Sequence, residues 1–225
     1  MKKGSVFQLS VLLEIFVFCA MLVGVAKGAY NSPIHSQVFL YFTYLSNIFI
    51  GLICGWSAYC KINDKKFSTV MKKLKFIATV SILFTFTVFW LFLSWDYSAD
   101  YLTGLVCTLL HTLIPLAAIA DFLFDRYSIT PTRKLVYQSL ISPIAYVAVV
   151  MFIWYPAGVT FNEYGKKFPY FFLDFNKYGW FTINTQAHIY GVVYWIILLF
   201  VFFVILAYSL NWARKFIERV KLNKF

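Results

Sequence analysis

Long apolar runs separated by short polar connections dominate this chain. A helix needs about 20 mostly apolar residues to cross a bilayer. Six runs have that length, at about 5–26, 38–60, 74–95, 101–124, 135–155 and 187–211. The pattern therefore predicts an all-α fold, in which residues 1–225 form a single membrane domain with a bundle of six transmembrane helices.

The basic residues between these runs predict how the bundle is oriented. Sixteen of the twenty Lys and Arg residues lie in the N-terminus, the second and fourth connections and the C-terminal tail. The other three connections hold only Lys27, Lys166, Lys167 and Lys177. Because basic residues collect on the cytoplasmic side, we expect both termini to be cytoplasmic in a multi-pass protein of the cell membrane.

A cleaved secretory signal is an alternative for the start of the chain. Two lysines precede an apolar stretch that ends in small residues. The apolar stretch is long for a signal peptide, however, and Glu14 interrupts it. We therefore expect the first run to be a helix of the mature protein.

Composition narrows the class of protein further. Hydrophobic residues make up 61% of the chain and charged residues only 13%, and the net charge is +11. The positive charge lies between apolar runs, so it indicates topology and membrane lipids as partners, not nucleic acid. Four cysteines and three histidines lack metal-ligand spacing, and we expect neither a metal nor another cofactor.

The connection at 156–186 is longer than a tight turn and rich in aromatic residues. A loop that lies in water has no need of so many aromatic rings. We expect it to pack onto the outer mouth of the bundle or to enter the membrane interface, where aromatic residues are favoured. In either position it can cover a site in the outer half of the membrane.

The second run carries a stripe of small and polar residues at every fourth position: Thr43, Asn47, Gly51 and Gly55. Each step of four residues advances about 40° around a helix, so all four lie near one face. Gly51 and Gly55 form a GxxxG motif, which allows close helix–helix contact. A hydrogen bond to the carbonyl four residues back in its own helix is the ordinary explanation of a lone Thr such as Thr43. Asn47 needs a partner, because an amide is rarely unpaired in the membrane.

The fourth run places His111 in the middle of the membrane. Pro115 lacks the N–H that normally bonds to the carbonyl of His111. We expect the helix to kink or open at this point. His111 is then either a structural hydrogen-bonding residue or part of a catalytic or ligand site.

Other polar residues in the runs form a second group of candidates. We expect Glu14, in the first run, to be protonated or paired with a polar neighbour. Asp121 and Asp125 lie near the inner end of the fourth run, where basic residues of the connections can pair with them. His188 begins the sixth run near the outer surface and is a further candidate for the site.

Three segments resemble one known family. They are Tyr41–Asn47, His111–Pro115 with Asp121 beyond it, and Phe168–Asp174. Their order and helical context resemble bacterial six-helix members of the androgen-induced protein family, which also includes the androgen-dependent regulator of tissue factor pathway inhibitor. The resemblance covers most of the chain. The third segment is similar to the bacterial branch and not to the animal one.

This resemblance implies an intramembrane threonine hydrolase, because animal members cleave fatty acid esters of hydroxy fatty acids with a Thr and a His. It assigns Thr43 as the nucleophile and His111 as its base. A hydroxyl nucleophile needs such a base, and the oxyanion needs hydrogen-bond donors. Since N–H groups within a helix are already bonded, Asn47, Tyr44 and Tyr170 are the candidates for this role. Asp174 is a candidate to orient His111.

Two other functions remain open. The chain is a non-catalytic scaffold or partner subunit if Gly51 and Gly55 form a docking face for another helix. It is a small proton-coupled transporter if Glu14, His111 and Asp121 relay protons, although no inverted repeat or pair of broken helices supports that function. The hypothesis that we carry forward is the hydrolysis of a lipid-like ester.

Overall fold

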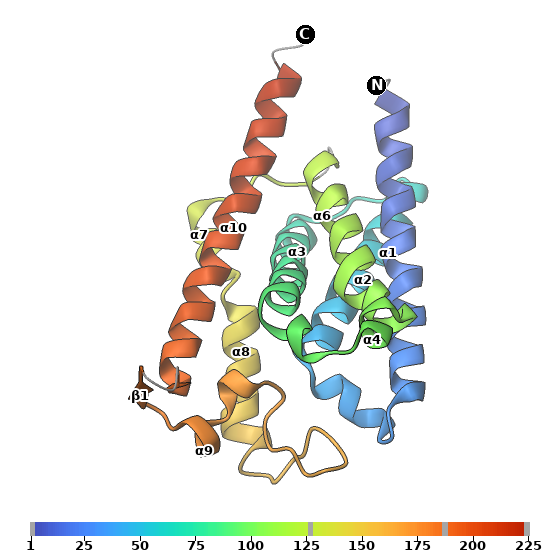
Figure 1. Ribbon diagram of the computed structural model, residues 1–225. Helices are drawn as coiled ribbons and strands as arrows, with labels where there is room; N and C mark the ends of the chain where they lie inside the picture. Colours follow the sequence, from blue (N-terminus) through green and yellow to red (C-terminus); the bar gives the residue numbers. More distant parts are fainter. Residues whose placement is uncertain (1–2, 126–127, 186–188, 223–225) are drawn as a thin grey trace.

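Six helices in the structure are long and apolar enough to cross a membrane. The computed structural model describes residues 3–125, 128–185 and 189–222, with side chains over 7–220 of these ranges. The six spans are Phe7–Asn31, Phe42–Ile62, Thr69–Asp96, Leu105–Phe124, Arg133–Trp154 and Val192–Val220. The expected all-α bundle is confirmed (Figure 1).

Each span contains one or more regular elements. The first is α1 (Lys3–Asn31), and the 3₁₀-helix η1 (His35–Leu40) precedes α2 (Phe42–Ile62). The third joins α3 (Thr69–Val88), the π-helix η2 (Phe89–Leu93) and the 3₁₀-helix η3 (Ser94–Asp96). The short helix α4 (Ala99–Thr103) precedes the fourth span. The span itself comprises α5 (Leu105–Thr108), the π-helix η4 (Leu109–Leu113) and α6 (Ile114–Phe124). The fifth comprises α7 (Arg133–Gln138), α8 (Ile141–Val149) and the π-helix η5 (Val150–Trp154).

The sixth span, α10 (Val192–Leu222), begins later than the sequence pattern predicts. The short strands β1 (Ile183–Asn184) and β2 (Ile189–Tyr190) form an antiparallel pair just before it. The residues of β2 lie within the apolar run and are predicted there as part of the helix. The connection before the pair contains η6 (Phe171–Leu173) and α9 (Phe175–Tyr178).

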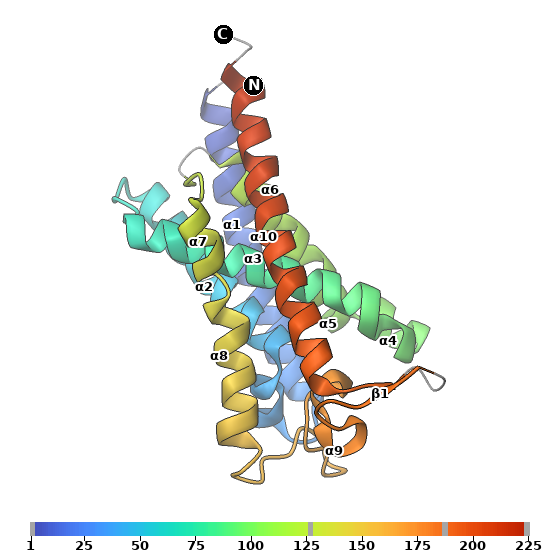
Figure 2. The ribbon, with the colours of Figure 1, turned by 90° about the vertical axis from the view of Figure 1, so that its left-hand side faces the viewer.

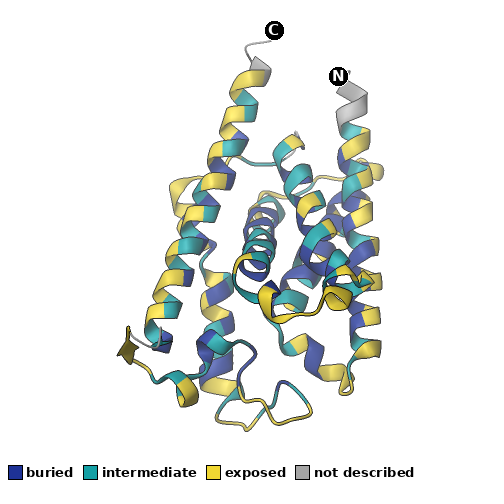
Figure 3. Ribbon diagram, viewed as in Figure 1, coloured by how far each residue is buried: buried dark blue, intermediate teal, exposed yellow. Residues whose placement is uncertain are grey.

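The spans pack as a group of four with two further helices against it. Helices α1, α2, α3 and α6 contact one another, while α10 contacts α3, α6 and α7. Figure 2 shows that α3 is strongly tilted relative to α1 and α10. The outward faces of α1 and α10 are largely exposed, although their residues are apolar (Figure 3). Helices that are apolar on both faces are typical of contact with lipid.

Both termini lie at one end of the bundle, which we call the terminal end (Figure 1). The connection between η5 and α10 lies at the opposite end, the loop end. Four apolar side chains of this connection are buried, namely Phe161, Phe168, Phe172 and Leu173. The prediction that the aromatic connection packs onto the bundle is therefore confirmed.

The GxxxG motif of α2 contacts a neighbouring helix of the same chain. A Cβ atom added to Gly51 would lie 2.7 Å from Met21, and one added to Gly55 would lie 2.7 Å from Phe18. Both neighbours belong to α1. The absence of side chains at these two glycines therefore allows α1 and α2 to pack closely.

Candidate functional site

Thr43 lies in the first turn of α2, because this helix begins at Phe42. The apolar run predicts an earlier start, near residue 38, which would place Thr43 in the second turn. Residues 35–40 form the separate helix η1 instead, and Tyr41 is the N-cap of α2. The N–H groups of a first helical turn have no acceptor within the helix. The expectation that N–H groups within a helix are already bonded therefore does not extend to Thr43, which lies in the first turn.

His111 lies in the π-helix η4, as expected from the missing N–H of Pro115. The carbonyl of His111 accepts a hydrogen bond from the Trp90 indole, with Nε1 3.1 Å away. The prediction that the helix opens here is confirmed. The widened turn changes the direction of the residues before Pro115 relative to those that follow.

The structure brings the two predicted catalytic side chains together. Thr43 Oγ1 lies 3.5 Å from His111 Nε2, which is at the long limit of a hydrogen bond. Such contacts are often long in the absence of substrate. The Phe89 ring stacks on the imidazole at a centroid distance of 3.6 Å and restricts its rotation.

The opposite nitrogen of the imidazole faces the backbone. The carbonyl of Cys107 lies beside the His111 ring, although Nδ1 has no hydrogen-bond partner of good geometry among the described residues. A proton on Nδ1 leaves Nε2 free to accept the proton of Thr43. The position of the ring is therefore suitable for a general base.

Asn47 connects the helices that carry these two residues. Its Nδ2 donates to the carbonyl of Thr43 at 2.8 Å and to that of Leu110 at 3.1 Å. Both amide hydrogens are thus used in this arrangement. The prediction that Asn47 donates to an oxyanion is wrong, because the residue instead holds the start of α2 against η4.

Tyr170 is the aromatic candidate whose phenol interacts with Thr43. Burial raises the pKa of its phenol, and this effect is opposed by hydrogen bonding with the side chain and the backbone of Thr43. The Tyr170 phenol and Thr43 therefore lie beside each other at the start of α2.

The other tyrosines of this region have different environments. The hydroxyl of Tyr44 lies against Gly28, where a Cβ atom would come within 2.2 Å of it. Tyr41 donates to the carbonyl of Phe161 at 2.6 Å. Tyr44 lines the same cavity as Thr43, but Tyr170 is the better placed of the two predicted donors.

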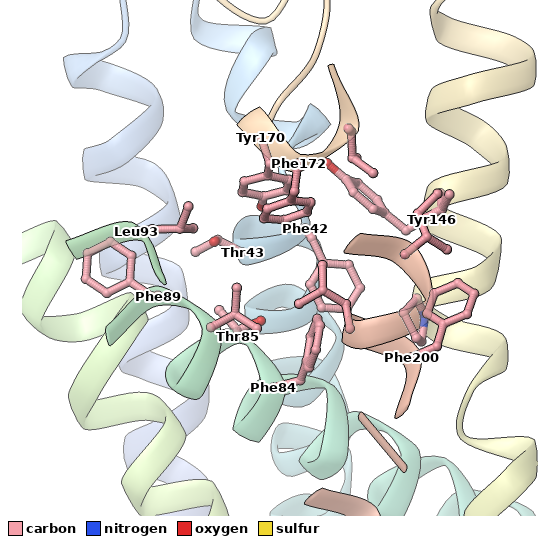
Figure 4. Close-up of a pocket in the computed structure, with 16 residues that line it drawn as sticks. Phe42, Thr43, Phe84, Thr85, Phe89, Leu93, Tyr146, Tyr170, Phe172 and Phe200 are labelled. Carbon is pink, nitrogen blue, oxygen red and sulfur yellow. The ribbon is translucent and has the colours of Figure 1, made fainter. Parts of the chain in front are cut away.

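Two cavities meet at Thr43. A cavity of about 850 Å³ at the loop end is lined by Thr43, His111 and Tyr170, together with several charged residues. A narrower pocket of about 50 Å³ has almost entirely apolar walls, contributed by α2, α3, α8 and α10. Thr43 and Tyr170 line both. In Figure 4, Tyr170, Leu93 and Thr85 surround the Thr43 side chain.

Two sequence candidates do not contribute to this site as predicted. The carboxylate of Asp174 accepts from the N–H of Lys177 at 3.1 Å and caps α9. It is not among the described residues that line either cavity, so the prediction that it orients His111 is wrong. His188 lies outside the described residues.

Glu14 belongs to a separate buried network toward the terminal end. Lys61 and Lys75 pair with Glu14 at 2.9 and 2.5 Å. Lys75 also pairs with Asp121 at 2.6 Å, and Lys61 with Asp125 at 2.9 Å. The predicted pairing of these carboxylates is confirmed, and it joins α1, α2, α3 and α6.

This network has the spacing of a metal site but already contains cations. One oxygen each from Glu14, Asp121 and Asp125 lie within 4.8 Å of one another. The ammonium group of Lys75 contacts all three carboxylates, at 2.5, 2.6 and 3.3 Å. It therefore occupies the position that a metal ion would need.

Several features of the site have no clear signal in the sequence. Trp90 and Phe89 look like ordinary lipid-facing aromatic residues in the third run. Only the pairing of Trp90 with a carbonyl freed by Pro115 distinguishes it. The N–H of Thr43 was missed because its availability depends on where α2 begins.

No protein-family model, curated protein or solved structure matches this chain. The function must therefore be argued from the site itself.

Proposed function

We propose that this protein is a membrane-embedded lipid-ester hydrolase in which Thr43 is the nucleophile and His111 the general base. The observation that carries this proposal is the contact between Thr43 Oγ1 and His111 Nε2, at 3.5 Å, where a large cavity meets an apolar pocket. A lipid ester needs both environments, because its acyl chain is apolar and its hydrolysis needs water.

The proposed reaction has two steps. Thr43 transfers its proton to His111 Nε2 while its oxygen attacks the ester carbonyl carbon. The tetrahedral intermediate then breaks its bond to the alcohol oxygen, which takes the proton from His111. Water from the loop-end cavity next gives a proton to His111 and attacks the acyl-threonine. This releases the fatty acid and restores the Thr43 hydroxyl.

The oxyanion is stabilised by the start of α2. The carbonyl oxygen of the substrate accepts one hydrogen bond from the first-turn N–H of Thr43 and a second from the hydroxyl of Tyr170, which lines the same cavity. A helix N-terminus also carries a partial positive charge. The loss of one oxyanion donor typically reduces kcat about 10²–10³-fold.

Membrane orientation is part of the same proposal. The positive-inside pattern favours a terminal end in the cytoplasm and a loop end outside. The ester then reaches Thr43 from the outer leaflet, with its acyl chain toward α8 and α10. The aromatic connection above the cavity limits the access of water.

The alternative functions have less support. A scaffold that docks through Gly51 and Gly55 needs a free face, whereas α1 covers both residues. A proton relay from His111 to Asp121 must pass Ile114 and Ala118, which are apolar and fully buried.

The decisive experiment is an ester hydrolysis assay on purified protein in detergent, with a palmitoyl ester of a fluorogenic alcohol. Thr43→Val and His111→Ala should each reduce turnover about 10³-fold or more. A fluorophosphonate probe should modify the peptide that contains Thr43, which mass spectrometry can identify.

Matched controls separate catalysis from folding. Thr87→Val removes a hydroxyl that bonds to Leu83 within its own helix, at 2.7 Å. His35→Gln changes a histidine that bonds to Ala29 outside the site. Both controls should keep full activity. If Thr43→Val and His111→Ala are as active as these controls, the proposed mechanism is wrong.

A further inference from the structure

The loop-end cavity has four charged side chains on its walls, two of each sign: Lys27, Lys166, Asp96 and Asp100. Among the residues that the structure describes, none of the four forms an ion pair. The Nζ atom of Lys27 lies 5.3 Å from the centre of the Tyr30 ring. These charges are therefore available to a ligand in the cavity.

The two aspartates belong to a segment that also carries aromatic rings. Asp96 and Asp100 flank Tyr97, and the Tyr97 and Tyr101 rings stack at a centroid distance of 4.4 Å. Burial raises the pKa of the Tyr97 phenol, and the charge of Asp96 raises it further. Carboxylates beside aromatic faces are suited to an ammonium group, because both attract a cation.

The basic side comes from two other segments. Lys27 belongs to α1, and Lys166 belongs to the connection before η6. Burial lowers the pKa of Lys166, an effect that Asp174 partly opposes. The Lys166 Nζ has a long contact of 3.4 Å to the carbonyl of Pro169. An ammonium group that forms no ion pair can bind a phosphate through charge-assisted hydrogen bonds.

We propose that this cavity binds the zwitterionic phosphodiester headgroup of an ester lipid. Lys27 and Lys166 contact the phosphate, while Asp96, Asp100 and the two stacked tyrosines contact the ammonium end. This inference rests on the proposed hydrolase function and names its substrate class. The headgroup then occupies the same cavity as Thr43 and His111, with the ester within reach of the nucleophile.

Other headgroups match these walls less well. A neutral glycerol headgroup leaves all four charges without a partner. A headgroup that carries only negative charge meets Asp96 and Asp100, which repel it. Phosphocholine and phosphoethanolamine share the zwitterionic chemistry, and a comparison of the two reveals whether the tyrosines favour a quaternary ammonium.

Binding can be measured independently of catalysis. The Thr43→Val variant in a neutral maltoside detergent is titrated with hexadecyl ether lipids, which cannot be hydrolysed. The probes are hexadecyl-glycerophosphocholine, hexadecyl-glycerophosphoethanolamine, hexadecyl-glycerophosphate and hexadecylglycerol. We expect both zwitterionic probes to bind about tenfold or more tightly than the anionic and the neutral probes.

Charge-removing variants in the same background test each wall. The double variant Lys27→Gln/Lys166→Gln should weaken the zwitterionic probes about tenfold or more and leave hexadecylglycerol unchanged. Asp96→Asn/Asp100→Asn should remove the preference for a zwitterionic probe over the anionic one. Lys167→Gln, which changes an exposed neighbour outside the cavity, should have no effect.

Each other outcome would overturn the headgroup proposal. The proposal is wrong if the four probes bind equally, if none binds, or if the anionic probe binds as tightly as the zwitterionic ones. It is also wrong if Lys167→Gln weakens binding as much as the double lysine variant. These results leave the hydrolase proposal intact, because that proposal is tested by turnover of a neutral fluorogenic ester.

Discussion

Replacing Lys75 with methionine tests how the buried network stabilises the bundle. The Lys75 Nζ contacts Glu14, Asp121 and Asp125 at 2.5, 2.6 and 3.3 Å, and its side chain is only 2% exposed. Methionine keeps much of the side-chain volume but leaves Asp121 without its ammonium partner, whereas Glu14 and Asp125 still pair with Lys61. Removal of one partner of a buried ion pair costs about 3–5 kcal/mol.

The free energy of unfolding can be measured in detergent by circular dichroism during denaturant titration. For a chain of this size, a loss of 3–5 kcal/mol corresponds to a decrease in Tm of about 6–20 °C. Lys73→Met is the matched control, because Lys73 belongs to the same helix and is exposed. It should change stability by no more than about 0.5 kcal/mol.

A double variant separates the charge effect from a packing effect. Asp121→Asn removes the carboxylate that loses its ammonium partner in Lys75→Met. The double variant should therefore recover about 0.5–3 kcal/mol relative to the sum of the single effects. The reasoning is refuted if Lys75→Met is as stable as Lys73→Met, or if the two changes in the double variant are simply additive.

Two further predictions concern single contacts between helices. Asn47→Leu should reduce ester turnover about a hundredfold, because a shift of about 1 Å between Thr43 and His111 has that effect. The fall in turnover must exceed any fall in the fraction of folded protein, which size-exclusion chromatography measures. Arg214→Met should lower the free energy of unfolding by about 3 kcal/mol, since this buried guanidinium donates to the last carbonyls of α6. Lys215→Met, on the exposed face of the same helix, should be neutral in the same denaturant titration.

The predicted tests also distinguish two kinds of buried polar residue. Lys75 joins helices through ion pairs and Arg214 through hydrogen bonds to backbone carbonyls, so their loss should lower stability. Thr43 has no salt bridge to lose, so Thr43→Val should remove activity with little change in stability. A protein in which both kinds of variant lower stability equally would have no separate functional site at Thr43.

The apolar pattern of the sequence was sufficient to determine the six spans and the all-α class. Each span consists of about 20 apolar residues in succession, and this property needs no information from other parts of the chain. Pro115 likewise indicated a local opening at His111, because the missing N–H is a property of one residue. The pairing of Asp121 and Asp125 with basic residues also followed from composition near the ends of the spans.

Tertiary structure alone decided the geometry of the site. Lys75 was counted among the basic residues of a connection, yet it is buried among carboxylates from two other helices. Asn47 was expected to face a substrate, yet its amide bonds to two carbonyls. Whether the N–H of Thr43 lacks an acceptor within the helix depends on the point where η1 ends and α2 begins. Such contacts join residues far apart in the chain, and the local periodicity of a sequence does not specify which distant residues come into contact.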